Sequence, residues 1–261
     1  MKEKDLSFWE HLEELRYVIF KILIVILVSV VVSFLLKDEL FSIILSPKNP
    51  DFFIYDFFDI ISGFLGLENS SDNDILQLEL ININLSGQFV AHMTVSFYVG
   101  ILLSSPYIIY KLFSFVSPAL FAEEKKYTLY LLSWGYMLFI IGMLLSYFLI
   151  FPLTLRFLAT YSVSSEVNNT IQLSSYINTM VVLSLLMGIV FEIPMIAWLM
   201  AKLKLVTSDF MKRYRKHAIV IAFVISAIIT PTTDIITLLL VGLPVIVLYE
   251  ISIFIVRYTT E

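Results

Sequence analysis

Cysteine is absent from this chain of 261 residues, and histidine occurs only three times. Without cysteine, the protein can form neither a disulfide framework nor a thiolate metal site. The chain also lacks Gly-x-Ser-x-Gly, His-Glu-x-x-His and a glycine loop suited to phosphate, which are the patterns of several large enzyme classes. We therefore predict that the protein is not an enzyme and has no catalytic residue, no metal site and no cofactor.

Apolar residues are abundant instead. They make up 59% of the chain, and the mean hydropathy is +0.90, whereas a typical soluble domain is about 45–50% apolar. Several apolar runs reach the roughly 20 residues that a helix needs to cross about 30 Å of hydrocarbon. Alternating strand patterning is absent from these runs, which favours helices over a barrel. The sequence therefore predicts an all-α integral membrane protein.

Six transmembrane helices are predicted, and both termini are expected in the cytoplasm. The spans cover about 18–36, 88–110, 127–151, 174–199, 217–232 and 235–256. The fifth and sixth spans are short, and the tight Thr-Thr-Asp connection between them predicts a hairpin. Fourteen of the 17 lysines and arginines fall in the two terminal segments and in the connections 111–126 and 200–216. Basic connections stay in the cytoplasm, so we expect a multi-pass protein of the cytoplasmic (inner) membrane.

Residues 1–17 are predicted to form a helix at the cytoplasmic interface. Ser7 and Glu10 have the spacing of a capping box, which places the helix start at Ser7. Phe8, Leu12 and Leu15 follow at i, i+4 and i+7, an apolar stripe suited to lying in the interface. The segment is acidic as well as basic and no small-residue cleavage site follows it, so we do not interpret it as a cleavable signal.

The connection 37–87 is predicted to be a large periplasmic loop that contains an amphipathic cap helix. Asn49-Pro50 is a typical helix start, with Asn as the cap and Pro in the first turn. Four apolar residues follow at helical spacing: Phe53, Phe57, Ile60 and Phe64. The polar and acidic stretch 66–79 is interpreted as a solvated loop.

Glu192 is the most informative single residue. It precedes Lys202 by ten residues, which places it about 15 Å deep, near the middle of the membrane. Pro194 leaves the carbonyl of Val190 without its helical donor, so the span is expected to kink there. A carboxylate at this depth costs several kcal/mol unless it is protonated, hydrated or paired. Two interpretations remain open: a polar docking or gating point that faces a groove, or a neutral acid hydrogen-bonded to a neighbouring helix.

Other carboxylates are less decisive on their own. Glu250 lies in the sixth span, and Arg257, seven residues later, is almost on the same helix face. A structural and a functional role for Glu250 are equally open. Glu14 and the pair Glu123-Glu124 lie in predicted cytoplasmic segments, where a carboxylate commonly does no more than keep a loop in water.

Four groups of motifs follow one another along the chain. They are His11-Leu12-Glu13-Glu14-Leu15-Arg16, then Phe115-Val116-Ser117-Pro118-Ala119-Leu120-Phe121-Ala122-Glu123-Glu124-Lys125-Lys126, then Phe191-Glu192-Ile193-Pro194, and last Thr230-Pro231 with Asp234, Leu243-Pro244 and Tyr249-Glu250-Ile251. In this order they resemble the TatC family, the multispanning receptor of the twin-arginine protein translocase. The resemblance implies a TatC-like helical bundle.

The resemblance also implies a function and a set of site residues. TatC-like proteins bind the twin-arginine signal peptides of folded proteins and nucleate a translocase driven by the proton-motive force. Glu14 and Glu124 match the carboxylates that contact the signal, Phe115 matches the aromatic residue beside them, and His11 and Arg16 belong to the first motif. Such pairs of carboxylates suit the task because a guanidinium group forms planar, bidentate bonds with them.

Partners are implied in the same way. Glu192 matches the polar point at which the helices of single-span TatA- and TatB-type subunits dock, and we group Pro194 and Glu250 with it. The resemblance implies an oligomer with itself and these subunits in contact with membrane lipids, and no nucleic acid. Two alternatives predict different behaviour. A proton- or ion-coupled transporter would use Glu192 and Glu250 as a relay, and a membrane assembly scaffold would tolerate charge changes at Glu14 and Glu124.

Overall fold

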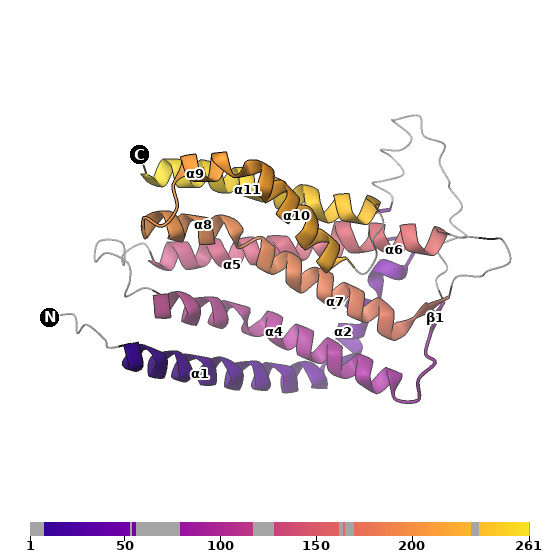
Figure 1. Cartoon of the computed structure of the whole chain (residues 1–261). Coiled ribbons are helices and arrows are strands. Elements are labelled where there is room, and N and C mark those ends of the chain that lie inside the picture. The colour runs from indigo at the N-terminus through magenta and orange to yellow at the C-terminus, as the bar shows by residue number, and fades with distance from the viewer. Residues whose placement is uncertain are drawn as a thin grey trace.

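The described part of the chain is a bundle of helices (Figure 1). The computed structural model describes residues 8–52, 54–55, 79–116, 128–161, 164, 170–230 and 235–260. Its longer helices are α1 (Phe8–Leu35), α4 (Gly87–Val116), α5 (Thr128–Leu145), α7 (Leu173–Val190), α10 (Arg215–Ile229) and α11 (Ile235–Thr260). Its shorter helices are α2 (Lys37–Ile44), the 3-10 turn η1 (Ser46–Lys48), the π-turn η5 (Ser146–Ile150), α6 (Phe151–Thr160), α8 (Ile193–Lys202) and α9 (Ser208–Arg213).

The two ends of the bundle differ in what they contain. Helix α1 begins, and α4 and α11 end, at one end, which also carries α9 (Figure 1). We name it the basic end, after the lysines and arginines of residues 202–216. The start of α1 and the end of α11 therefore lie at the same end of the bundle, as the predicted topology requires. Which side of a membrane this end faces stays a prediction.

Five helical segments of the described chain are long and apolar enough to cross a membrane. They are Leu12–Leu35, Gly87–Leu112, Ser133–Thr160, Leu173–Lys202 and Thr237–Thr259. The predicted span 217–232 corresponds to α10, which has 15 residues and so a length of roughly 22 Å at 1.5 Å per residue. That is short for about 30 Å of hydrocarbon, so the count of six crossings stays a prediction.

Helix α1 joins two elements that the sequence analysis kept apart. The predicted interfacial helix 1–17 and the first span 18–36 form one unbroken helix from Phe8 to Leu35. This boundary was wrong because no glycine or proline occurs in this helix, and a helix without a breaker continues. Ser7 lies outside the described residues, so the predicted cap is not tested.

The third span is longer than predicted. It was expected to end at 151, but α5, η5 and α6 form a continuous helical segment that ends at Thr160. Pro152 lies in the first turn of α6, where a proline is tolerated. The π-turn before it has i→i+5 bonds, and the helix continues through it although Pro152 has no backbone N–H to donate. Arg156, which the charge count assigned to a loop, is therefore helical.

A parallel pair of short strands was not predicted. Strand β1 (Leu80–Ile81) pairs with β2 (Ile171–Gln172), with Leu80 opposite Ile171. Strand β2 directly precedes α7, and β1 lies a few residues before α4, so both helices start at this end of the bundle. We name it the strand end (Figure 1). Each strand has only two residues, too few for the alternating pattern that reveals a strand in a sequence.

Helix α2 and η1 occupy the strand end, where the sequence analysis expected only loop before Asn49. Three buried or partly buried tyrosines, two of them from distant segments, donate to backbone carbonyls of this part of the chain. The bonds are Tyr147 Oη to Ile43 O at 2.7 Å, Tyr176 Oη to Ile44 O at 2.9 Å and Tyr55 Oη to Pro47 O at 2.8 Å. Burial raises the pKa of Tyr55 to about 12, so this hydroxyl keeps its proton at neutral pH. The tyrosines thus satisfy carbonyls that a helix end leaves without intrahelical donors.

The predicted start of the cap helix at Asn49-Pro50 was wrong. The N–H of Asn49 donates to Ser46 O at 3.0 Å, and its backbone is extended, so Asn49 ends η1 instead of beginning a helix. Helical backbone recurs at residues 54–55. Phe53, the three later positions of the predicted stripe and nearly all of the stretch 66–79 lie outside the described residues.

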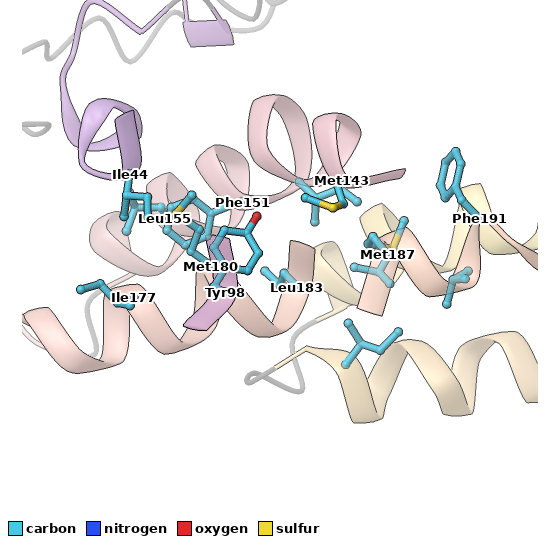
Figure 2. Packing of buried hydrophobic residues seen from close by; sticks show 14 of the residues in the cluster. Ile44, Tyr98, Met143, Phe151, Leu155, Ile177, Met180, Leu183, Met187 and Phe191 are labelled. Carbon is cyan, nitrogen blue, oxygen red and sulfur yellow. The ribbon is translucent and has the colours of Figure 1, made fainter. Parts of the chain in front are cut away.

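The core lies where α5, η5 and α6 face α7, with Tyr98 of α4 and Ile44 of α2 packed against them (Figure 2). Two glycines let α5 and α7 approach closely. A Cβ atom on Gly142 would lie 2.7 Å from the carbonyl oxygen of Met187, and one on Gly188 would lie 2.8 Å from the ring of Phe139. The backbones are therefore in contact, a common arrangement between membrane helices.

Candidate functional site

A hollow opens beside the first turns of α1 at the basic end. It has a volume of about 610 Å³, and its described lining comprises Glu13, Glu14, Arg16, Tyr17 and Phe20. Glu14 and Arg16 are exposed, and the Arg16 guanidinium lies 5.9 Å from the centre of the Phe20 ring. Acidic, basic and aromatic groups are thus presented together, which suits a ligand that is both cationic and partly apolar.

Phe115 lies in the last turn of α4, half-buried, at the same end of the bundle as Glu14. Helices α1 and α4 pack along each other and run in opposite directions (Figure 1), so the start of one lies beside the end of the other. The structure therefore brings Phe115 to the same end as the first motif. The side chain of His11 and the whole of Glu124 lie outside the described residues, so the predicted pairing of Glu14 with Glu124 is not tested.

The fourth predicted span is broken at Glu192. Helix α7 ends at Val190, and α8 begins at Ile193 with Pro194 in its first turn. The backbone crosses the break through two bonds, from Glu192 N to Ile189 O at 3.1 Å and from Ile196 N to Glu192 O at 2.9 Å. The predicted kink is confirmed, and it places a carboxyl group at the joint between two helices.

The side chain of Glu192 packs against α5. A Cβ atom on Gly135 would lie 3.3 Å from Glu192 Oε2 and would clash with the sulfur of Met195, so the absence of a side chain at Gly135 leaves room for both groups. Glu192 Oε1 is buried and has no hydrogen-bond partner among the described residues. The interpretation as an acid bonded through this oxygen to a neighbouring helix therefore receives no support. A buried oxygen without a partner is costly.

Glu250 has a cationic partner that the sequence analysis did not consider. Arg215, the first residue of α10, places its guanidinium 2.7 Å from Glu250 Oε2, and both side chains are nearly half-exposed. The neighbouring Tyr249 donates to Met211 O at 2.9 Å. These bonds tie α9 and α10 to α11, which favours the structural role for Glu250. No hydrogen bond joins Glu250 to Glu192 in the described part of the chain, so a direct relay between them is absent there.

Comparison with known proteins decides the family. The family model described as "Sec-independent protein translocase protein (TatC)" matches residues 10–244. The chain belongs to the TatC family. The TatC protein of Blattabacterium sp. subsp. Periplaneta americana (strain BPLAN) is 33% identical over 262 residues, which cover 100% of this chain and 98% of that protein. TatCy of Bacillus subtilis (strain 168) is 33% identical, with coverage of 98% of this chain and 90% of that protein.

Solved TatC structures share the fold. The crystal structure described as "Twin Arginine Translocase Receptor- TatC" matches with a TM-score of 0.76 and 31% sequence identity, and the match covers 97% of this chain and 100% of that chain. The predicted multi-pass helical membrane fold of the TatC type is therefore confirmed. The range matched by the TatC family model contains Glu14, Phe115 and Glu192 but ends before Glu250.

Two residues of the candidate site were missed in the sequence. Gly135 leaves space for the Glu192 carboxyl, and Arg215 pairs with Glu250. Neither has a local pattern that would reveal its role, because each contact joins helices that are separated along the chain. Among the described residues, no group of three His, Asp or Glu side chains could hold a metal ion.

Proposed function

We propose that this chain is the signal-peptide receptor and core subunit of a twin-arginine translocase, which binds the twin-arginine signal peptides of folded proteins for export. The observation that carries the proposal is the match over nearly the whole chain to a solved structure described as a twin-arginine translocase receptor. The acidic and aromatic hollow on α1 adds a surface with the chemistry that such a peptide needs. No covalent step is required of the receptor.

Capture of the peptide is electrostatic in this proposal. Two arginine side chains of the signal form bidentate, charge-assisted bonds with Glu14 and Glu124, while Phe115 contacts the adjacent residues and His11 and Arg16 shape the first motif. Glu14 is exposed beside the hollow of α1, so a peptide reaches it without displacing a helix. Ion pairs at a membrane interface are stronger than fully exposed pairs because less water screens them.

The basic end faces the cytoplasm in this arrangement, with the protein in the cytoplasmic membrane. Its support is the excess of lysine and arginine at that end, since such residues are retained on the cytoplasmic side. Single-span TatA- and TatB-type subunits dock at the break between α7 and α8. There a buried Glu192 oxygen without a partner among the described residues would accept a hydrogen bond from a partner helix.

The receptor function is tested by changing the signal peptide while the protein stays intact. Membrane vesicles with the basic end outward are photocrosslinked to a peptide carrying either Arg-Arg or Lys-Lys. Lysine cannot form the planar two-bond contact of a guanidinium, so crosslinking is expected to fall at least about tenfold, which corresponds to roughly 1.4 kcal/mol. Equal crosslinking of both peptides would show that the protein does not read the arginine pair.

Replacing Glu192 with alanine is expected to weaken association with the single-span subunits several-fold while signal-peptide crosslinking stays within about twofold. The change removes the carboxyl group at the helix joint but leaves Pro194 and the backbone bonds of the break in place. Co-purification of the subunits with the full-length protein measures the effect.

The matched control for this change is Glu192→Gln, which keeps the shape and the hydrogen-bonding capacity of the side chain. It is expected to retain most of the association. Normal recovery of the subunits with Glu192→Ala, in a protein that elutes as the wild type on size exclusion, would remove Glu192 from the docking site.

A further inference from the structure

The segment between α8 and α10 forms a fixed structure at the basic end. Thr207 caps α9 by accepting a hydrogen bond from Phe210 N at 3.3 Å. Met211 of α9 is buried in a small cluster with residues of α8 and α11, and its carbonyl accepts the bond from Tyr249 already described. The backbone that carries the charged side chains of this segment is therefore anchored on the bundle.

Six basic residues lie within residues 202–216, and three of them have neither an ion pair nor a cation-π contact within the described structure. Lys212 lies 3.4 Å from Asp209, Arg215 pairs with Glu250, and Lys202 lies over the ring of Trp198. The other three are Lys204, Arg213 and Lys216, and all are exposed. Their charge is not neutralised by a described carboxylate, so this surface attracts anions.

An apolar stripe continues from these charges along α10. Val220, Val224 and Ile228 follow Lys216 at successive steps of four residues, which places the four side chains on one helix face. These three apolar residues are 61%, 53% and 74% exposed, as expected for a helix face that contacts lipid. The surface therefore combines basic residues at the start of α10 with exposed apolar residues along the same helix.

We propose that Arg213 and Lys216 bind the headgroup of an anionic phospholipid, whose acyl chain lies along Val220, Val224 and Ile228. A lipid matches both parts of the surface, whereas a nucleic acid or an acidic soluble protein would leave the apolar stripe uncovered. A zwitterionic lipid has the same phosphate, but Arg213 and Lys216 would repel its ammonium group. Basic residues next to membrane helices commonly recognise anionic lipids in this way.

The test compares lipid binding to the full-length protein with two matched double variants. Protein in detergent is titrated with phosphatidylglycerol or phosphatidylcholine, and bound lipid is counted by native mass spectrometry. The variant Arg213→Gln/Lys216→Gln is expected to bind phosphatidylglycerol on the order of 25-fold more weakly, about fivefold for each charge removed. The control Lys21→Gln/Lys111→Gln removes the same charge from α1 and α4 and is expected to change binding less than twofold.

Three results would overturn the proposal. The first is an equal loss of phosphatidylglycerol in both double variants, and the second is wild-type protein that binds phosphatidylcholine as tightly as phosphatidylglycerol. The third is full competition by glycerophosphoglycerol, which has the headgroup without acyl chains and would assign the site to a free phosphate ester. The signal-peptide test and the lipid test use different ligands and different residues, so each proposal can fail without the other.

Discussion

Charge reversal at Glu14 is expected to reduce twin-arginine peptide crosslinking by at least about tenfold, and reversal at both Glu14 and Glu124 to abolish it. A charge-assisted hydrogen bond contributes about 1.5–3 kcal/mol, and a lysine in place of the carboxylate adds repulsion of the guanidinium group. The side chain of Glu14 is exposed, so Glu14→Lys does not disturb the core. Photocrosslinking in vesicles, with each variant at equal abundance, measures the loss.

The chain offers a closely matched control for this experiment. Glu13 precedes Glu14 on α1, is also exposed and lines the same hollow, but the resemblance assigns the signal contact to Glu14 and not to Glu13. Glu13→Lys makes the same change of net charge and is expected to reduce crosslinking less than threefold. If Glu13→Lys and Glu14→Lys reduce crosslinking equally, the peptide senses the general field of the basic end and not a carboxylate pair.

A side chain at Gly142 is expected to destabilise the whole bundle. Even the Cβ atom of alanine would lie 2.7 Å from Met187 O and 2.7 Å from the ring of Phe191. Because one of these neighbours is backbone, a rotamer change cannot relieve the clash, and α5 must move away from α7. Overpacking of this kind costs about 1–3 kcal/mol, and valine at this position is expected to exceed that range.

Thermal unfolding of the purified protein in detergent measures this effect. At roughly 2–4 °C per kcal/mol for a chain of this size, Gly142→Ala is expected to lower the Tm by several degrees. Gly242→Ala is the control, because a Cβ atom there would meet only side-chain atoms, the nearest being Phe223 Cε1 at 3.1 Å. A Tm for Gly142→Ala at or above that of Gly242→Ala would mean that the two helices tolerate separation.

The sequence predicted those features that have local causes. Long apolar runs marked the helices, and Pro194 marked the break at Glu192, because a missing backbone donor disrupts a helix at a defined position. The predicted end of the third span at 151 lies directly before Pro152, but a π-turn lets the helix continue there. A proline alone does not reveal whether the preceding turn becomes a π-turn, as at Pro152, or the helix breaks, as at Pro194. Both outcomes relieve the clash between the proline ring and the preceding turn.

Features that depend on distant partners were not predictable in this way. The tyrosine bonds to Ile43 and Ile44 join residues 104 and 132 positions apart, and the pair of Arg215 with Glu250 spans 35 positions. No periodicity in one sequence encodes such a pairing. The same holds for the candidate site. Motifs in the sequence identified Glu192 and Glu14, but the space that Gly135 leaves for the Glu192 carboxyl can be seen only in the packed helices.

The long-range hydrogen bonds at the strand end can form only late in the synthesis of the chain. A chain is synthesised from its N-terminus, so α1, α2 and α4 are complete before Tyr147, Tyr176 or β2 exists. Until then the carbonyls of Ile43 and Ile44 lack their tyrosine donors, and β1 lacks its partner strand. The first half of the protein is therefore synthesised before these hydrogen bonds and the strand pairing can form. The synthesis of α7 completes them, because that helix carries Tyr176 and adjoins strand β2.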